Sequence, residues 1–311
     1  MLGTFGLKPI HEPSTGDDPS PFCFDAYIEK EKTTGMILLE DYSEDIICKV
    51  MRGRGISDTE VCRESGISEA ELAALLQGEA LEDPLRKVAP VLGLGADALV
   101  ACANKTWYPD QPDVFDGFDM ANTKFHDMMV NAYVVWDPAT SLVVVFDSGA
   151  DSRPLLKTIS NHSLKGALIL LTHSHADHVI DLDRLVSETG SPPVWVNALE
   201  SGDDDFPAGV QTFDAGKTFQ VGGLTIDSVL TNGHSPGGTT FIVHGLSRRL
   251  AIVGDSIISG SMGGSMTAYE QARKNIIEHL LTLPQDTILA PGHGPLTTVE
   301  QERTNNPFFA K

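Results

Sequence analysis

Short runs of apolar residues recur through the second half of the chain, separated by turns rich in Gly, Pro, Asp and Asn. Runs of this kind are typical of buried β-strands. Two other segments, 179–189 and 269–283, space their apolar residues as a helix does. The expected strands cover residues 132–136, 142–146, 167–171, 194–197, 224–230, 239–243, 250–253 and 287–289. Strands with helices to cover them predict a layered α/β domain.

The segment 42–104 has a helical pattern throughout. Ile46, Ile47 and Val50 recur at helical spacing, and Ser57 and Ser68 each precede a glutamate by three positions, as in a capping box. We therefore expect several short helices joined by tight turns.

Composition suggests how the rest of the chain is divided. Residues 1–41 are rich in Pro, Gly, Asp and Ser, which bury too little apolar surface to offset the entropy of ordering. Residues 105–124 contain prolines that limit helix continuation. We predict an extended N-terminal arm over 1–41, a small all-α domain over 42–104, a linker over 105–124 and the α/β domain over 125–311.

Charge and cysteine content exclude several classes of function. The 311 residues carry a net charge of -21, which disfavours binding to a phosphate backbone. The four cysteines show no C-x-x-C spacing, so we expect ordinary thiols in a reducing compartment rather than disulfides or metal ligands. The N-terminus has no signal-peptide pattern, and no apolar run is long enough to cross a membrane. We therefore expect a cytoplasmic protein with no membrane partner.

Residues able to bind metal gather where the predicted strands end. Residues 172–178 directly follow an apolar run and contain three histidines and an aspartate, and three further donors lie on Gly-rich turns downstream. Neutral imidazole and carboxylate groups are ligands of zinc, iron and manganese. Six of the seven donors suffice for two metals, and the seventh can bridge. The candidate ligands are His173, His175, Asp177, His178, His234, Asp255 and His293.

This ordered set resembles the metallo-β-lactamase superfamily of hydrolases, whose signature is H-x-H-x-D-H followed by a single His, a single Asp and a final His. The resemblance covers about residues 125–311 and implies an αββα sandwich with two divalent metals at one edge of the sheets. We expect zinc, with iron or manganese as alternatives, because His and carboxylate ligands suit all three.

The resemblance also implies a role for each ligand. His173, His175 and His234 would hold one metal, Asp177, His178 and His293 would hold the other, and Asp255 would bridge them. A hydroxide shared by the two cations would attack the substrate carbonyl. Asp177 and Asp255 are the expected catalytic carboxylates, and Asp177 could protonate the leaving group.

The C-terminal sequence narrows the expected substrate. Residues 283–308, including Pro291-Gly292-His293-Gly294-Pro295, are most similar to the glyoxalase II-like (hydroxyacylglutathione) thioester hydrolases. We expect a thioester substrate, with a lactone, as in quorum-quenching lactonases, as the alternative. Recognition of glutathione is left open, because those enzymes have a C-terminal helical glutathione-binding domain. Met262 and Met266 are expected at the pocket rim, where they would contact an apolar acyl chain.

The order of short helices over residues 57–94 resembles the helix-turn-helix domain of phage repressors. Its recognition helix would begin near Ser68, but it offers Glu69, Glu71 and alanines instead of side chains that read bases. We therefore expect no nucleic-acid binding, and we expect these helices to pack on the catalytic domain or to dimerise. A metal-containing transcriptional regulator is the less favoured alternative, and homo-oligomerisation is left open.

Several other polar residues are candidates to support the site. Asp147 is the best candidate to orient a ligating imidazole, with turn capping as the alternative, and Thr172 and Ser256 are weaker candidates. Ser235 is expected to cap its turn. We expect structural roles for the remaining histidines and an exposed acidic loop at residues 203–205; those histidines are His11, His126, His162, His244 and His279.

Overall fold

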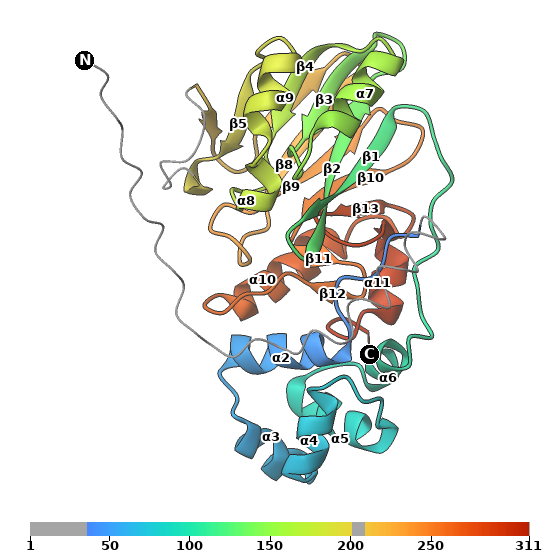
Figure 1. Ribbon diagram of the computed structural model, residues 1–311, viewed down its shortest axis with the longest axis vertical. Helices are drawn as coiled ribbons and strands as arrows, with labels where there is room; N and C mark the ends of the chain where they lie inside the picture. The colour runs from blue at the N-terminus through green and yellow to red at the C-terminus, as the bar shows by residue number, and fades with distance from the viewer. Residues whose placement is uncertain (1–35, 201–208, 311) are drawn as a thin grey trace, which may run out of the picture. The chain divides into compact units, whose positions relative to one another are not determined.

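Two six-stranded sheets face each other in the computed structural model, which describes residues 36–200 and 209–310 (Figure 1). The first sheet has the order β1 (Phe118–Phe125), β2 (Met128–Trp136), β3 (Leu142–Phe146), β4 (Lys165–Leu170), β5 (Val194–Asn197) and β6 (Gln211–Phe213). The second has the order β14 (Thr297–Thr298), β13 (Ile288–Pro291), β10 (Leu250–Gly254), β9 (Thr239–His244), β8 (Leu224–Leu230) and β7 (Thr218–Val221). A separate hairpin joins β11 (Ile257–Ile258) to β12 (Ser261–Met262).

Helices cover the outer face of each sheet. Helices α7 (Arg153–Asn161) and α9 (Leu182–Glu188) lie over the first sheet, and α10 (Tyr269–Asn275), which continues as the π-helix η2 (Ile276–Leu280), lies over the second (Figure 1). Short elements α8 (Ala176–Val179), η1 (Ala198–Glu200) and α11 (Val299–Asn305) occupy the connections. The predicted αββα layering is observed.

Alternation along β3 shows how the layers are built. Val144 and Phe146 point between the two sheets, whereas Val143 and Val145 point toward the helices. Successive side chains of a strand face opposite sides, so a strand buried on both faces must be apolar throughout. Phe146 meets Phe241 of the opposite sheet at a ring-centroid distance of 5.4 Å.

Five helices precede the sheets: α2 (Ser43–Arg54), α3 (Asp58–Ser65), α4 (Glu69–Leu75), α5 (Glu82–Leu92) and α6 (Ala96–Ala103). The predicted capping box forms fully at Ser68, whose hydroxyl accepts from Glu71 N while Glu71 accepts from Ser68 N. At Ser57 only the first of these two bonds forms. Apolar residues of these helices share one core with α10 and with β10 of the second sheet. Residues 39–311 thus form one compact unit.

Three expectations need correction. Strand β1 begins at Phe118, so the last part of the predicted linker is a strand that pairs with β2 along its full length. Strands β6 and β7 were not predicted, because they are short and partly exposed. Met262 of β12 is buried in the core with 1% of its surface exposed, whereas Met266 is 78% exposed. Of the two methionines expected at the pocket rim, only Met266 can therefore contact a substrate.

Some expectations fall on residues outside the described ranges, namely His11, Cys23, the acidic residues 203–205 and most of the 1–41 arm. Cys48, Cys62 and Cys102 are free thiols. Within residues 36–200 and 209–310, every helix is too short or too polar to cross a bilayer.

Candidate metal centre

The seven candidate ligands come from four connections that meet at one edge of the two sheets. Residues 172–178 follow β4, His234 lies between β8 and β9, Asp255 follows β10 and His293 follows β13. Strands β10 and β13 are parallel neighbours, so Asp255 and His293 leave the second sheet side by side.

The structure brings all seven side chains together. Three overlapping sets of three could each hold a metal ion, since their ligand atoms lie within 4.8 Å of one another. These sets are His173, His175 and His234; His173, His178 and Asp255; and Asp177, His178 and His293. The first and third match the two sets expected from the sequence.

Asp255 lies between these two sets. Its Oδ2 is 3.3 Å from Nε2 of His234 and 3.3 Å from Nε2 of His293, while its Oδ1 is 3.4 Å from Nε2 of His178. Asp177 Oδ2 lies 3.2 Å from Nε2 of His293. Asp255 therefore contacts imidazoles of both sets, as a bridging ligand requires.

Asp147 holds the imidazoles that follow β4. Its Oδ2 accepts from Nδ1 of His178 at 2.9 Å and from the Thr172 hydroxyl at 2.7 Å. The Thr172 hydroxyl lies 3.0 Å from Nδ1 of His173. Because Thr172 donates its only hydrogen to Asp147, it accepts from His173, whose proton is thereby placed on Nδ1. The expected orienting contacts of Asp147 and Thr172 are confirmed.

Backbone carbonyls orient two further imidazoles. Nδ1 of His234 lies 3.0 Å from the carbonyl of Gly264, and Nδ1 of His293 lies 2.7 Å from the carbonyl of Met129. A carbonyl only accepts, so both rings carry a proton on Nδ1, which leaves Nε2 as the nitrogen that can bind a metal. Such outer contacts fix the tautomer of a metal-binding histidine.

Unpaired atoms at the centre indicate that a cation fits there. Nε2 of His178 and Oδ1 of Asp255 are buried and have no hydrogen-bond partner in the part of the chain that the structure describes. Nδ1 of His175 lies 3.1 Å from Nε2 of His173 and 2.9 Å from Nε2 of His234. Nitrogen lone pairs this close attract each other only with a proton or a cation between them. The donor set suits a first-row divalent metal.

The electrostatics of the centre also favour a cation. Burial lowers the pKa of His173 well below its usual range, which keeps its lone pair available. Burial alone would lower the pKa of His178 too, but Asp255 and Asp147 raise it to about 10. The pKa of His293 rises to about 12, because Asp255 and Asp177 outweigh burial. The carboxylates that hold these protons would attract a divalent cation still more strongly.

Gly292 allows His293 to approach the centre. A Cβ at this position would lie 2.0 Å from Oδ1 of Asp255 and 2.7 Å from Cε1 of His178. Any larger residue would displace these ligands, which explains the glycine before His293 in physical terms.

A buried glutamate that the sequence did not reveal joins two of the ligand loops. Glu200 accepts from the backbone and hydroxyl of Ser174 at 3.0 and 2.6 Å, and from Gly237 N at 2.5 Å. Ser174 lies between His173 and His175, and Gly237 lies in the loop of His234. No local pattern marks Glu200, since its partners are distant in sequence.

Strand β2 supports the His293 loop. The side-chain amide of Asn131 donates to the carbonyls of Pro291 at 2.9 Å and Gly294 at 2.8 Å, and the Tyr133 hydroxyl donates to Pro291 at 2.5 Å. Asn131 is fully buried. A polar residue inside an apolar strand was the available signal, because a buried amide needs partners.

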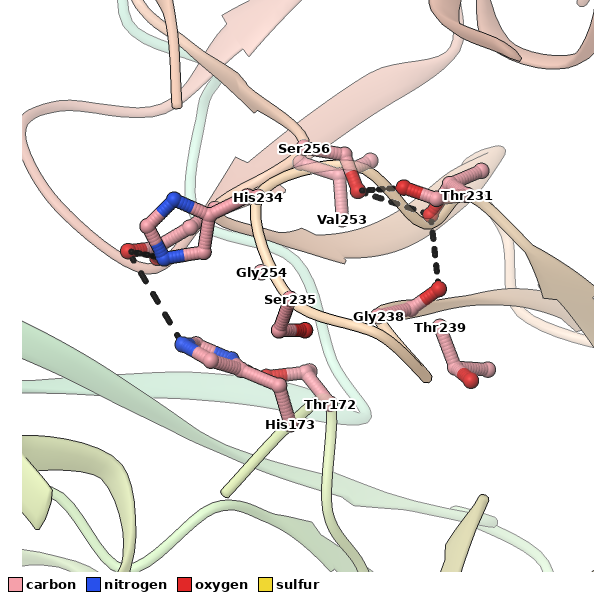
Figure 2. A pocket seen from close by; sticks show the side chains of 11 residues that line it. Thr172, His173, Thr231, His234, Ser235, Gly238, Thr239, Val253, Gly254 and Ser256 are labelled. Atoms are coloured by element: carbon pink, nitrogen blue, oxygen red, sulfur yellow. Dashed lines mark hydrogen bonds and ion pairs between the residues drawn. The ribbon is translucent and has the colours of Figure 1, made fainter. Parts of the chain in front are cut away.

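A small cavity lies behind His173 and His234. Figure 2 shows their two imidazoles on one side of it and the hydroxyls of Thr231 and Ser256 on the other. The Ser256 hydroxyl bonds to the hydroxyl of Thr231 at 2.7 Å and to its carbonyl at 3.2 Å. Within the described ranges it makes no hydrogen bond to a ligating imidazole, so the structure does not support Ser256, the weaker candidate, as an orienting residue. The Ser235 hydroxyl is buried without a partner among the described residues, so its expected capping bond is absent.

The other described histidines lie outside the ligand sets found in residues 36–200 and 209–310. His162 stacks against Trp136 at a centroid distance of 4.9 Å, and His244 lies 3.1 Å from Asp227. His126 packs against the Phe125 ring. These contacts agree with the structural roles expected for the three residues.

Comparison with known proteins gives consistent matches for the second half of the chain. A family model described as the Metallo-beta-lactamase superfamily matches residues 127–293. A probable metallo-hydrolase of Streptococcus pyogenes serotype M6 is 31% identical over 199 residues, which cover 57% of this chain and 84% of that protein. The hydroxyacylglutathione hydrolase GloC of Haemophilus influenzae is 29% identical over 199 residues, covering 58% and 92%.

A solved structure shares the fold. The B3 metallo-beta-lactamase BLEG-1 aligns with a TM-score of 0.50 at 27% identity, covering 62% of this chain and 100% of that one.

Proposed function

The chain belongs to the metallo-beta-lactamase superfamily and is a metal-dependent hydrolase, and on that premise we propose that it cleaves a thioester with a dinuclear metal site. The observation that carries this proposal is the convergence of seven donors, arranged as two sets of three with Asp255 between them. A single cation would leave either three closely spaced imidazoles or the Asp177 set without a metal.

In this proposal His173, His175 and His234 would hold one divalent cation, Asp177, His178 and His293 would hold the other, and Asp255, which contacts imidazoles of both sets, would be shared by them. We favour zinc, with iron or manganese as alternatives. When bound, such cations polarise a carbonyl and bring the pKa of water down to about 7, which supplies a nucleophile at neutral pH.

The protein's own residues fix the geometry of this chemistry. Asp147, Thr172 and the carbonyls of Met129 and Gly264 aim the imidazoles before substrate arrives. Preorganised ligands avoid the cost of reorganisation during the reaction. Among the carboxylates, Asp177 has the more exposed side chain, at 12% against 6% for Asp255. Asp177 is therefore the better placed to pass a proton to the leaving group, whereas Asp255 stays a ligand.

The thioester is the finer part of the proposal. It is supported by the similarity to a hydroxyacylglutathione hydrolase over most of that protein's length and by the sequence around His293. The exposed Met266 lies two residues after Gly264, which contacts His234, so an apolar side chain is available beside the centre. A flexible thioether of this kind adapts to an apolar acyl group.

A substrate panel tests the proposal. The purified protein is assayed with S-D-lactoylglutathione, acyl thioesters of increasing chain length, acyl-homoserine lactones and simple esters, and its metals are counted by elemental analysis. We expect close to two first-row metals per chain and the highest kcat/KM on a thioester. Turnover of lactones with no turnover of thioesters would replace the thioester assignment with lactone hydrolysis. A metal-replete protein with fewer than two bound metals would reject the dinuclear site.

A further inference from the structure

Helix α2, which lies outside the family match at residues 127–293, packs beside the loops that carry the candidate ligands. In Figure 1, α2 lies next to α10, and the two helices share apolar contacts through Ile46, Ile47, Tyr269 and Ala272. These contacts alone would describe ordinary core packing. Polar contacts around His234 indicate a more specific role.

The first link from α2 to His234 runs through Lys49. Its ammonium donates to the carbonyl of Met262 at 3.0 Å and forms an ion pair with Asp41, which is itself buried. Two residues beyond Met262, the Gly264 carbonyl accepts from Nδ1 of His234 at 3.0 Å. Gly263 and Gly264 have no side chains to restrict this segment. Two other contacts hold this segment, since Gly263 N donates to the carbonyl of Ser256 at 3.5 Å and the Ser265 hydroxyl accepts from Ala268 N at 3.1 Å. The Lys49 contact is the one that comes from α2, and it joins a charged side chain to the segment that carries the Gly264 carbonyl.

The second link runs through α10. Gly53 of α2 lies so close to Tyr269 that a Cβ on Gly53 would come within 2.6 Å of the ring. Further along α10, the Asn275 side chain donates to the carbonyl of Asn232 at 2.7 Å and to its side-chain oxygen at 2.9 Å. Asn232 is two residues before His234. The His234 loop is thus held from two sides by elements that contact α2.

We infer that Lys49 of α2 is a positioning residue for the metal set of His173, His175 and His234, acting on His234 through the Met262–Gly264 segment. The inference rests on the proposed dinuclear site. The N-terminal helices would then contribute to metal binding instead of binding nucleic acid. The set of Asp177, His178 and His293 is held by Asp147 and Met129, so it should not depend on Lys49.

The test compares metal affinities of the full chain. Zn²⁺ binding is measured by competition with a chromophoric chelator for the wild type, Lys49→Met, and Lys87→Met as a control on α5, where Lys87 makes only an exposed ion pair with Asp83 at 2.7 Å. We expect Lys49→Met to weaken one of the two sites about 10-fold, at the low end of losses seen when the support of a ligating imidazole is removed. The weakened site should be the one lost in His234→Ala. Lys49→Arg should restore most of the affinity, and Lys87→Met should match the wild type.

Two further results separate the explanations. A lower melting temperature in Lys49→Met with both affinities unchanged would show a purely structural role and overturn the inference. A wild type that binds fewer than two zinc ions would instead reject the proposed dinuclear site. Should Lys49→Met not fold because the buried Asp41 loses its partner, the double variant Asp41→Asn, Lys49→Met removes that charge as well, and unchanged affinities in the double variant would also overturn the inference.

Discussion

The carboxylate of Asp147 and the imidazole of His178 form a buried pair, in which Oδ2 accepts from Nδ1 at 2.9 Å. Asp147 has a φ of 60°, a left-handed conformation that Asp and Asn tolerate better than most residues. The same carboxylate accepts from the backbone N–H of Thr172 at 2.7 Å, so it binds both the backbone and the hydroxyl of the residue that begins the ligand loop. Asp147 therefore fixes both the chain direction at the ligand loop and the nitrogen that His178 offers to a metal.

The first prediction concerns the Asp147→Asn variant. Asparagine keeps the shape of the side chain and tolerates the left-handed backbone. Its NH₂ group, however, replaces one acceptor oxygen and faces an N–H or O–H donor of Thr172 or the Nδ1–H of His178. We expect metal affinity to fall about 10- to 100-fold, as for other outer contacts of metal-binding histidines. Equilibrium dialysis with Zn²⁺ measures this. Asp137→Asn serves as the control, because Asp137 also accepts backbone and hydroxyl hydrogens but lies in a turn away from the centre. Equal losses in both variants would contradict a specific role for Asp147.

The second prediction concerns Glu200, which joins the loop of Ser174 to the loop of Gly237. In Glu200→Gln an NH₂ group replaces one carboxylate oxygen, so the donors of either Ser174 or Gly237 lose their acceptor. A buried donor without an acceptor costs about 1–3 kcal/mol. We expect a lower free energy of unfolding by about that amount, measured by urea denaturation, together with reduced hydrolytic activity. Glu188→Gln is the control, since Glu188 is exposed at the end of α9. Unchanged stability in Glu200→Gln would show that the loops are held by other contacts.

The ligands were predictable because their spacing is local. Three histidines and an aspartate fall within residues 172–178, and His234, Asp255 and His293 follow β8, β10 and β13. The predicted runs 224–230, 250–253 and 287–289 match these three strands to within two residues at each end. Apolar runs ended by turn residues have few alternative structures. The predicted ligand roles themselves still await a direct test.

The supporting contacts were not predictable, for a physical reason. Asn131, Glu200 and Lys49 each reach partners far away in sequence. The position of Asn131 inside an apolar strand signals a buried amide but not its partners, and no local pattern marks Glu200 or Lys49. Strand β1 was missed because its inward residues include Thr123, which bonds to Ala150 N instead of joining the apolar core. Polar residues with tertiary partners weaken the alternation on which a sequence prediction depends.

The third prediction concerns pH and the fully buried Glu302. Burial raises the pKa of Glu302 to about 7, although Asn306, Thr297 and Gly260 donate hydrogen bonds that oppose this. A raised pKa means that the folded state binds the proton more tightly than the unfolded state does. The stability contributed by this proton is fully present below about pH 4.5, which is the ordinary pKa of a glutamate, and it is lost as the pH rises through about 7.

We therefore expect the wild type to lose stability relative to Glu302→Gln as the pH rises from about 5 to 8. Thermal melts of both proteins across this range give the difference directly. Glu300→Gln provides the control, because Glu300 is an exposed neighbour on α11. A constant difference between wild type and Glu302→Gln would contradict titration of Glu302 in this window.

The fourth prediction concerns Asp255→Ala. Asp255 contacts imidazoles of both metal sets, so its loss removes a shared carboxylate from each. Metal ions contribute several kcal/mol to transition-state stabilisation, so we expect kcat/KM to fall by about 10³-fold or more. The fold should survive in the metal-free protein, because Asp147 and Asp177 still contact His178 and His293 when Asp255 is removed. Activity, bound metal and the circular dichroism melt are compared with Asp286→Ala, whose carboxylate pairs with Arg249 at the exposed surface at 2.7 Å. Full metal content and activity in Asp255→Ala would show that Asp255 is not the bridging carboxylate. Loss of bound metal and of activity, with an unchanged melting temperature of the metal-free protein, would show that Asp255 binds the cations and is not needed for the fold.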